Sequence, residues 1–326
     1  MNKQFVNNLF SANLPDFENR ATALFHFQYE QNAVYRSFCD LLKIQPPAVT
    51  AASHIPFLPI CFFKTHEVKT TVFEPEFIFE SSGTSQTTQS RHWVKDISVY
   101  EESFKRGFEQ QYGRIDNWCI LGLLPSYLER GGSSLVYMVK QMMDESQHPN
   151  NGFYLHNNEE LYKNLKLLET NGQNTLLIGV TYALLDFAEK YQLQCYNTAI
   201  METGGMKGRR EELTGDEVHL RLKKSFGVPT IHSEYGMTEL LSQAYSKGDG
   251  IFHCPPWMRV IVRDEDDPLY VKAKGRGAVN IIDLANMYSC SFIATDDVGE
   301  VYEDGSFKIL GRMDNSDIRG CSLLAV

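Results

Sequence analysis

Residues 175–201 read TLLIGVTYALLDFAEKYQLQCYNTAIM, and this stretch decides the fold. Leu176 to Val180 is a short apolar run of the kind that forms a buried strand, and Tyr182 to Tyr191 has the pattern of a helix. Thr198 to Met201 then begins a second strand. Strands joined by a helix in this way are typical of a parallel sheet, so the stretch predicts two parallel strands with a helix between them.

The same alternation continues on both sides, from about residue 79 to residue 240. Upstream, the apolar run Cys119 to Leu124 precedes a helical stretch from Leu135 to Met143. Downstream, Thr214 and Glu217 have the spacing of a capping box that opens a helix. This repeated alternation predicts an open parallel sheet with helices on both faces.

After Phe252 the sequence changes to short β-rich runs at close spacing, namely LYVKA, AVNIID, SFIAT, GEVY and FKILG. Asp304-Gly305 lies between two of these runs in the position of a tight hairpin turn, because glycine tolerates positive φ. The runs predict a smaller antiparallel unit. We therefore expect an α/β core with an N-terminal helical segment over residues 1–250, and a β-rich subdomain with a tail over residues 251–326.

The N-terminal segment has two recognisable parts. Residues 18–43 carry apolar side chains at helical spacing and end before Pro46-Pro47, which predicts a helix. The next segment, IPFLPICFFK from Ile55, contains two prolines, and these exclude a regular central strand or helix. It is predicted to be an extended apolar connector.

Bulk properties indicate a soluble protein of a reducing cytoplasm. Of the 326 residues 43% are apolar, and the net charge of −10 is spread without an acidic or basic block, which argues against nucleic acid or an anionic membrane as main partner. The 7 cysteines form no CxxC pair, so a zinc or disulfide framework is not expected. The polar N-terminus lacks a signal peptide, and no stretch approaches the ~20 apolar residues of a membrane span.

Three segments carry residues suited to binding a nucleotide. The first, residues 80–85 (ESSGTS), follows an apolar run and offers backbone N–H and hydroxyl donors to phosphate groups. It lacks the GxxxxGK[ST] spacing of a Walker loop. A plain surface loop is the alternative for this segment.

The second segment is IHSEYGMTE, residues 231–239. Tyr235 offers a ring that can stack on a base, Gly236 allows close approach, Thr238 offers a hydroxyl to a phosphate oxygen, and Glu239 offers a carboxylate to Mg²⁺. The alternative is a solvated turn that leads into a helix over residues 237–245.

The third segment combines TDDVG, residues 295–299, with GRMDN, residues 311–315. Carboxylates accept hydrogen bonds from vicinal ribose hydroxyls, and arginine donates several more. Alternatively, the aspartates of TDDVG are ordinary acids of a hairpin turn, and the arginine of GRMDN is an ordinary surface residue.

The order SSGTS, EYGMTE, TDDVG and GRMDN resembles the motif succession of the adenylate-forming superfamily of acyl-CoA synthetases and related ligases, across nearly the whole chain. ETGGMKGRRE, IPFLPICFFK and IRGCSLL narrow the resemblance to the LuxE family of acyl-protein synthetases. It implies an α/β fold like the N-terminal domain of adenylate-forming enzymes, with parallel sheets flanked by helices and a smaller antiparallel β subdomain at the C-terminal end.

The resemblance also implies residue roles. The phosphate loop is matched by Ser81, Ser82, Gly83, Thr84 and Ser85. The stretch along the adenine is matched by Gly204, Gly205 and Met206, with Tyr235 and Gly236 at the stacking position. Thr238 matches the α-phosphate ligand and Glu239 the Mg²⁺ carboxylate. Asp297 and Arg312 match the ribose contacts, and Asp314 matches the hinge before the usual C-terminal domain.

Two features depart from the superfamily pattern. The Gly-x-x-Lys that usually ends the phosphate loop is replaced by SQTTQSRHW, where Arg91 or His92 is a candidate for the lost charge. Most members also carry roughly another hundred residues after the hinge, with a catalytic lysine, whereas twelve residues follow Asp314 here. Lys207, Arg209 and Arg210 are the candidate replacements for that lysine.

In the acyl-protein synthetases that this sequence resembles, a cysteine near the C-terminus carries the acyl group. The resemblance implies that Cys321 is this cysteine. Alternatively, Cys321 is buried and packs as a small apolar side chain, which is the commonest role of a free cysteine. His232 either lines the acyl pocket and touches the carboxylate, or serves as a structural hydrogen-bonding group.

The resemblance therefore predicts an enzyme that uses ATP and Mg²⁺ to turn a carboxylic acid into acyl-AMP and then a thioester, with a fatty acid as the expected substrate. The first alternative passes the acyl group to coenzyme A or to the phosphopantetheine of a carrier protein. The second is a non-catalytic nucleotide-binding or partner-binding module. An acyl reductase or a carrier protein is the expected partner of the enzyme.

Overall fold

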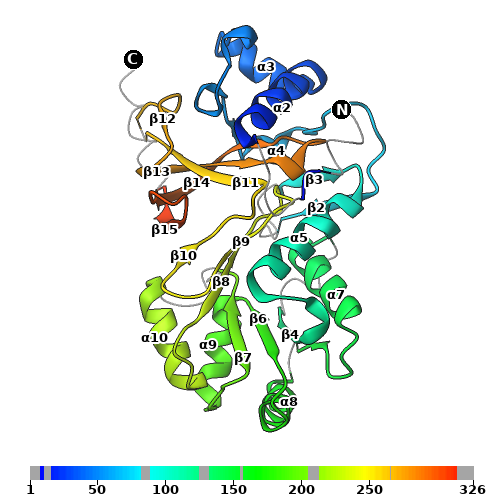
Figure 1. Ribbon diagram of the computed structural model, residues 1–326, viewed down its shortest axis with the longest axis vertical. Helices are drawn as coiled ribbons and strands as arrows, with labels where there is room; N and C mark the ends of the chain where they lie inside the picture. Colours follow the sequence, from blue (N-terminus) through cyan, green and yellow to red (C-terminus); the bar gives the residue numbers. More distant parts are fainter. Residues whose placement is uncertain are drawn as a thin grey trace, which may run out of the picture.

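Two sheets of different kinds organise the chain (Figure 1). The computed structural model describes residues 8–10, 16–81, 89–124, 132–154, 157–204, 213–264 and 266–313. A mostly parallel sheet occupies the lower half of Figure 1, an antiparallel sheet lies above it, and the N-terminal helices cover the top. The predicted α/β class, with a smaller antiparallel unit after it in the chain, is confirmed.

The mostly parallel sheet has the strand order β5-β4-β6-β7-β8-β9. Its strands are β4 (Cys119–Leu123), β5 (Gly152–Phe153), β6 (Thr175–Gly179), β7 (Thr198–Glu202), β8 (His232–Tyr235) and β9 (Ala244–Ser246). Neighbouring strands run parallel up to β8, and β9 pairs with β8 in the antiparallel sense. Every residue of β4 and β6 is buried, as expected for apolar strands covered on both faces.

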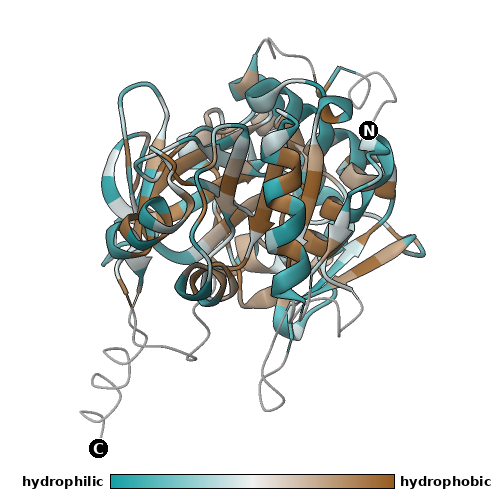
Figure 2. Ribbon diagram, turned by 90° about the horizontal axis from the view of Figure 1, so that it is seen from below, coloured by the Kyte–Doolittle hydropathy of each residue, from teal (hydrophilic) through white to brown (hydrophobic). Residues whose placement is uncertain are grey.

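Helices cover both faces of this sheet, as predicted. They are α5 (Ile97–Tyr112), α7 (Ser134–Ser146), α8 (Asn158–Thr170), α9 (Thr181–Lys190) and α10 (Gly215–Phe226). In Figure 1, α5 and α7 lie on one side of the strands and α9 and α10 on the other. Figure 2 shows the apolar strands inside and the hydrophilic helix faces outside. The predicted capping box of α10 is present, with both reciprocal bonds between Thr214 and Glu217.

The antiparallel sheet has the strand order β10-β15-β14-β13-β11-β12. Its strands are β10 (Ile251–Phe252), β11 (Met258–Arg263), β12 (Val271–Lys272), β13 (Gly275–Asp283), β14 (Phe292–Val301) and β15 (Phe307–Arg312). The runs SFIAT and GEVY, predicted as separate, form the single strand β14, which continues through a register shift between Val298 and Gly299. The predicted hairpin between β14 and β15 is confirmed, with Gly305 at φ 82°.

The single helix predicted over residues 18–43 is wrong, because the chain forms two helices, α2 (Phe17–Gln31) and α3 (Ala33–Leu41). Asn32 between them is fully buried and extended, and its side chain accepts a hydrogen bond from the Tyr35 N–H. Its amide also donates to the Ser289 carbonyl at 3.0 Å. A tertiary contact therefore interrupts a sequence that has continuous helical periodicity.

The proline-containing connector joins the N-terminal part of the chain to the antiparallel sheet. Its Leu58–Pro59 forms β1, a short strand parallel to β14, and Phe62–Thr65 forms α4. A hairpin of β2 (Phe77–Glu80) and β3 (Arg91–Val94) follows. Short 3-10 turns lie at Pro46–Ala48, Ala52–His54, Ile115–Asn117 and Leu284–Asn286. The domain boundary at residue 250 falls just before β10 and stays a prediction.

Two properties of the described residues concern the requirements of a membrane span and of a metal site. Within those ranges, no helix combines the length and apolarity needed to cross a membrane. The same residues contain no group of three or more His, Cys, Asp or Glu side chains placed to hold a metal ion.

Candidate functional site

Three of the residues predicted to contact a nucleotide meet at the junction of the two sheets. The Tyr235 hydroxyl, at the end of β8, donates to Asp297 Oδ2 at 2.7 Å. Arg312 Nε donates to Asp297 Oδ1 at 3.3 Å, because Arg312 on β15 is the register partner of Asp297 on β14. The pairing of β14 with β15 thus places the Asp297 carboxylate next to the Arg312 guanidinium. The end of β8 places the Tyr235 hydroxyl within hydrogen-bond distance of the same carboxylate.

Aromatic packing holds the Tyr235 ring in place. The ring centroid lies 5.5 Å from that of Phe307 in an edge-on arrangement and 5.8 Å from that of Phe252. Burial, the nearby Asp297 charge and the hydrogen bond to it raise the pKa of Tyr235 well above its usual value, so the phenol stays protonated at neutral pH. The ring is only partly buried, which leaves part of its surface open to a partner.

Thr238 and Glu239 lie in the turn after Gly236, and two buried side chains hold its backbone. His92 Nδ1 lies 2.8 Å from the Thr238 carbonyl oxygen, and Asn286 Nδ2 donates to the Glu239 carbonyl at 2.7 Å. Because a carbonyl oxygen only accepts, His92 Nδ1 must carry the proton. The helix considered over residues 237–245 does not form, because this turn leads directly into β9.

The same histidine is excluded as a replacement cation. Burial lowers the pKa of His92 to about 4, although its hydrogen bonds act in the opposite direction. The ring is therefore neutral at neutral pH. Arg91 is solvent-exposed, and its Nε lies 3.5 Å from the Glu80 carboxylate. Of these two candidates, only Arg91 carries a positive charge.

Glu239, the predicted Mg²⁺ ligand, is 5% exposed. Burial raises the pKa of its carboxyl, while a hydrogen bond from Ser90 and the charges of Lys64 and Arg312 act in the opposite direction. A nucleotide-bound Mg²⁺ commonly takes one or two carboxylates and completes its shell with phosphate oxygens and water. One carboxylate beside two cations and a hydroxyl therefore fits a magnesium–phosphate group, although the described residues alone form no complete metal cage.

Ser81, the one residue of the predicted phosphate loop that the structure describes, directly follows β2 of the β2–β3 hairpin. Ser81 and Ser90 close its base, since Ser81 N–H donates to the Ser90 carbonyl at 3.0 Å and Ser90 N–H donates to Ser81 Oγ at 2.9 Å. Ser90 also bonds Glu239, so the base of the loop adjoins the Thr238–Glu239 turn. Ser82, Gly83, Thr84 and Ser85 lie outside the described residues.

Gly204 follows β7 in the left-handed region of backbone conformation, with φ 72°. Its N–H donates to Glu202 Oε2 at 2.7 Å, and the Thr181 hydroxyl donates to the same oxygen at 2.9 Å. Burial acts to raise the pKa of Glu202, but the hydrogen bonds it accepts lower it overall. Gly205, Met206, Lys207, Arg209, Arg210, Asp314 and Cys321 lie outside the described residues.

His232 lies three residues before Tyr235 and faces α5 rather than Asp297. The Tyr112 hydroxyl is 3.1 Å from His232 Nδ1. Burial, together with the charge of Lys247, lowers the pKa of His232 to about 4. The imidazole is therefore neutral, and the structure does not bring it together with Tyr235, Asp297 and Arg312.

Sequence reasoning missed several residues at this site. Lys64, Ser90 and Asn286 all act on the Thr238–Glu239 turn. Lys64 lies in IPFLPICFFK and Ser90 in SQTTQSRHW, but the sequence alone assigned no binding role to either residue. For Asn286 the only signal in the sequence is a polar residue in an apolar context, shortly after the run AVNIID. That signal is common in cores and does not identify a partner.

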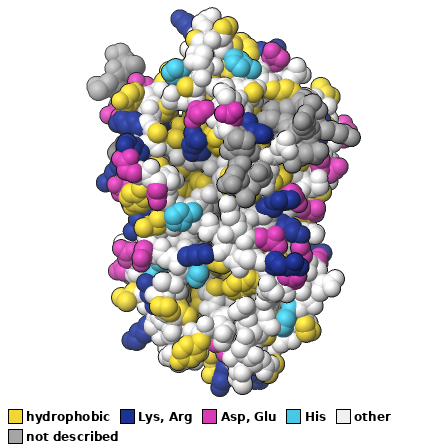
Figure 3. Space-filling model, in the orientation of Figure 1, with side chains coloured by type: hydrophobic (Ala, Val, Ile, Leu, Met, Phe, Trp, Pro, Cys, Tyr) yellow, Lys and Arg dark blue, Asp and Glu magenta, His cyan; other side chains and the backbone are white. Residues whose placement is uncertain are grey.

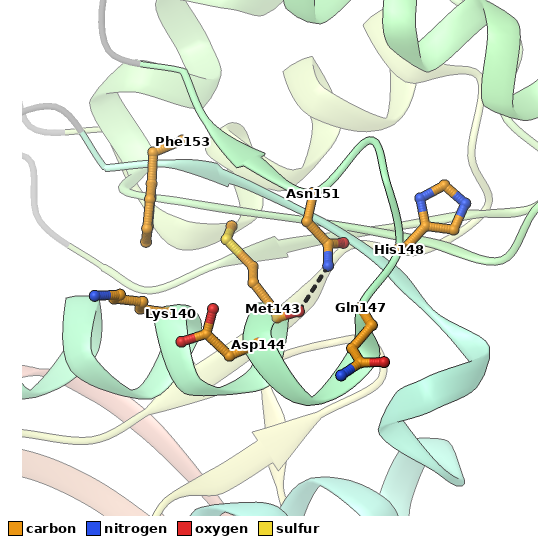
Figure 4. Close-up of a pocket in the computed structure, with 7 residues that line it drawn as sticks. All are labelled: Lys140, Met143, Asp144, Gln147, His148, Asn151 and Phe153. Carbon is orange, nitrogen blue, oxygen red and sulfur yellow. Dashed lines mark hydrogen bonds between the residues drawn. The ribbon is translucent and has the colours of Figure 1, made fainter.

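A surface depression lies away from this site, at the edge of the parallel sheet formed by β5 (Figure 4). It has a volume of about 660 Å³ and is lined by Lys140, Met143, Asp144, Gln147, His148, Asn151 and Phe153. None of the predicted site residues lines it. Figure 3 shows that Lys and Arg alternate with Asp and Glu over the face drawn there, without a field of one sign.

Comparison with known proteins bears on the fold and on distant homology. No family model matches the chain. In sequence the chain is 22% identical over 328 residues to a long-chain-fatty-acid–luciferin-component ligase of Aliivibrio fischeri, covering 92% of this chain and 85% of that protein.

Solved structures share the fold. A 2-hydroxyisobutyryl-CoA ligase in complex with 2-HIB-AMP matches with a TM-score of 0.68 at 13% identity, over 92% of this chain and 70% of that chain. ATP-bound MatB from Rhodopseudomonas palustris matches with a TM-score of 0.52 at 16% identity, over 72% of this chain and 47% of that chain. The chain is thus a distant homologue of the LuxE acyl-protein synthetases and has the fold of the adenylate-forming ligases.

Proposed function

We propose that this protein uses ATP to convert a carboxylic acid into an acyl-adenylate and then transfers the acyl group to a thiol. The observation that carries the proposal is the convergence of Tyr235, Asp297 and Arg312 beside the Thr238–Glu239 turn. These groups match, in kind and arrangement, what a nucleotide requires: a partly open ring, a carboxylate for ribose hydroxyls and donors for phosphate. The A. fischeri relative is named for a long-chain fatty acid, so fatty acids are the first acids to test.

In the first step, a carboxylate oxygen of the acid attacks the α-phosphorus, a P–O bond forms, and pyrophosphate leaves with the electron pair of the broken P–O bond. In this proposal Asp297 and Arg312 hold the ribose, and the Thr238 hydroxyl binds the α-phosphate. Mg²⁺ held by Glu239 would neutralise phosphate charge. The residues act mainly by alignment and by electrostatic stabilisation.

In the second step, a thiolate attacks the acyl carbon and AMP leaves. Cys321 is the proposed acceptor, and coenzyme A or phosphopantetheine is the alternative. One solved structure of the same fold, with a TM-score of 0.63, is a complex with 2-HIB-AMP and CoA, which keeps the alternative open. An acyl reductase or a carrier protein would then receive the acyl group.

The activation step is tested by ATP–pyrophosphate exchange with a panel of carboxylic acids. Acid-dependent exchange is the expected result. If calorimetry detects ATP binding but no acid supports exchange, the protein is a nucleotide-binding module and the proposed activity is wrong.

The acceptor is tested by mass spectrometry of the protein after incubation with ATP and an active acid. A mass increase that disappears in Cys321→Ser identifies Cys321 as acceptor. An unmodified protein together with acylated coenzyme A or acylated carrier protein identifies the alternative.

A further inference from the structure

Three polar side chains share one face of the β8–β9 pair. Glu234 on β8 is the register partner of Tyr245 on β9. Gln243 comes just before β9, and its Cγ and the Glu234 Oε1 atom both lie against Gly236. We call Glu234, Gln243 and Tyr245 the polar patch. This face packs against α5, where the Tyr245 ring contacts Tyr112 at 5.7 Å and Phe108 at 6.2 Å between centroids.

The polar patch is buried, and two of its atoms lack a hydrogen-bond partner among the described residues. Glu234, Gln243 and Tyr245 are 9%, 5% and 2% exposed. Gln243 Oε1 and the Tyr245 hydroxyl are buried without a partner among the described residues. Burial first, and then the charge of Glu202, raise the pKa of Glu234 to about 8, and no hydrogen bond contributes. Buried polar groups nearly always have a partner, so two neighbouring exceptions beside a buried carboxyl require an explanation.

The patch lies directly beside the proposed reaction centre. Glu234 Oε1 folds over Gly236, where a Cβ would lie 2.3 Å from that oxygen and 3.2 Å from Gln243 Cγ. Gly236 begins the turn that carries Thr238. In an acyl-adenylate, a single oxygen separates the acyl carbon from the α-phosphorus. An acid that reacts next to Thr238 therefore has its first carbons near Gly236 and the carboxyl that covers it.

The hydrogen-bonding capacity of the patch defines what it can bind. Gln243 Oε1 only accepts hydrogen bonds, whereas the Tyr245 hydroxyl and a protonated Glu234 carboxyl both donate and accept. A plain hydrocarbon chain would leave Gln243 Oε1 and the Tyr245 hydroxyl unpaired, at a cost for each buried group. A substituent with an O–H or N–H donor satisfies Gln243 and can pair with the other two.

Resting on the proposed function, we infer that the acid activated by this protein carries a hydroxyl or amino group close to its carboxylate, and that Glu234, Gln243 and Tyr245 bind this group. A hydroxyl exchanges donor and acceptor bonds with the patch. An ammonium group binds with Glu234 ionised, and the proton of the carboxyl is released to solvent.

The test compares matched acids in ATP–pyrophosphate exchange. Pairs of equal chain length are used, with and without a hydroxyl or amino group on the second or third carbon. The expected kcat/KM is at least ~10-fold higher for the substituted acid, because a site built to bind an O–H or N–H rejects the analogue that lacks it. Glu234→Leu and Tyr245→Phe are expected to bring this ratio toward one.

Tyr154→Phe is the matched control, since its hydroxyl accepts from Asn164 at the far edge of the sheet. It should leave the ratio unchanged. Tyr245→Phe removes a single atom, and it keeps the test valid if Glu234→Leu does not fold.

The outcomes separate the two proposals. If the wild-type protein activates plain acids as efficiently as substituted ones, adenylation stands and the inference is wrong. If the preference exists but survives both patch variants, the patch holds only water and the inference is equally wrong. If no acid of either kind supports exchange, the proposed function fails and takes this inference with it.

Discussion

At the scale of single residues, the Asp297 carboxylate has the clearest role to test. One of its oxygens accepts from Tyr235 and the other from Arg312, and a carboxylate oxygen can accept a second bond from a ribose hydroxyl. Asp297→Asn keeps the shape and removes the charge. Because a hydrogen bond to a charged group contributes ~1.5–3 kcal/mol, we expect ATP affinity to fall about 10-fold or more.

Calorimetric titration with ATP measures this effect. Tyr235→Phe is the comparison, because it keeps the aromatic ring and removes only the hydroxyl, and a smaller loss is expected from it. Unchanged ATP affinity in Asp297→Asn would contradict the proposed ribose contact.

His92 supports a second residue-scale prediction. Its neutral ring donates to the Thr238 carbonyl from a strand that lies 146 residues away in sequence. His92→Leu removes the donor and frees the turn that carries Thr238 and Glu239, so we expect kcat for exchange to fall about 10-fold. His92→Asn places an amide N–H near the position of Nδ1, and it is expected to recover most of the activity. Full activity in a folded Leu variant would refute this positioning role.

At the scale of elements, the connector of β1 and α4 determines where Lys64 lies. Pairing of β1 with β14 anchors α4, and the Lys64 charge then acts on the Glu239 carboxyl. We expect Lys64 to supply part of the positive charge at the phosphates. Lys64→Met should raise KM for ATP several-fold, and Lys64→Arg should not.

Exchange kinetics at varied ATP concentrations measure that change in KM. Lys69→Met is a matched control, because Lys69 pairs with Glu67 at 2.9 Å outside the site. Equal effects of the two methionine variants would show that Lys64 acts only through the overall charge of the protein.

The same connector shows how far elements can be predicted from sequence. Strands β4, β6 and β7 and helices α7, α9 and α10 follow from local periodicity and caps, signals that lie within each segment. The pairing of β1 with β14 does not, because a two-residue strand beside proline carries no information about its partner. The break between α2 and α3 also escapes prediction, since it depends on Ser289 near the other end of the chain.

At the scale of the whole molecule, the candidate site lies where the two sheets meet. The order of the motifs was enough to nominate Tyr235, Asp297 and Arg312, which come from separate strands. It did not reveal the contacts of His92, Asn286 and Lys64, because these depend on how the β2–β3 hairpin, the 3-10 turn after β13 and the connector pack around the Thr238–Glu239 turn. Residues recognisable by motif were therefore predictable, and the residues that support them were not.

The junction of the sheets also makes stability depend on pH. Burial and the Glu202 charge raise the pKa of Glu234 to about 8, from an ordinary value of 4.5, so the folded protein keeps a proton that the unfolded chain loses. Below about pH 4.5 this carboxyl does not lower the free energy of unfolding, because it is protonated in both states. As the pH rises toward 8, it lowers the free energy of unfolding increasingly. Glu234→Gln stays neutral. Its free energy of unfolding, relative to that of the wild type, should therefore rise between pH 5 and pH 8, by up to a few kcal/mol. Urea unfolding at each pH measures this difference, with the exposed Glu74→Gln as control. A difference that stays constant over this range would mean that the ionised carboxyl finds a partner in the folded protein.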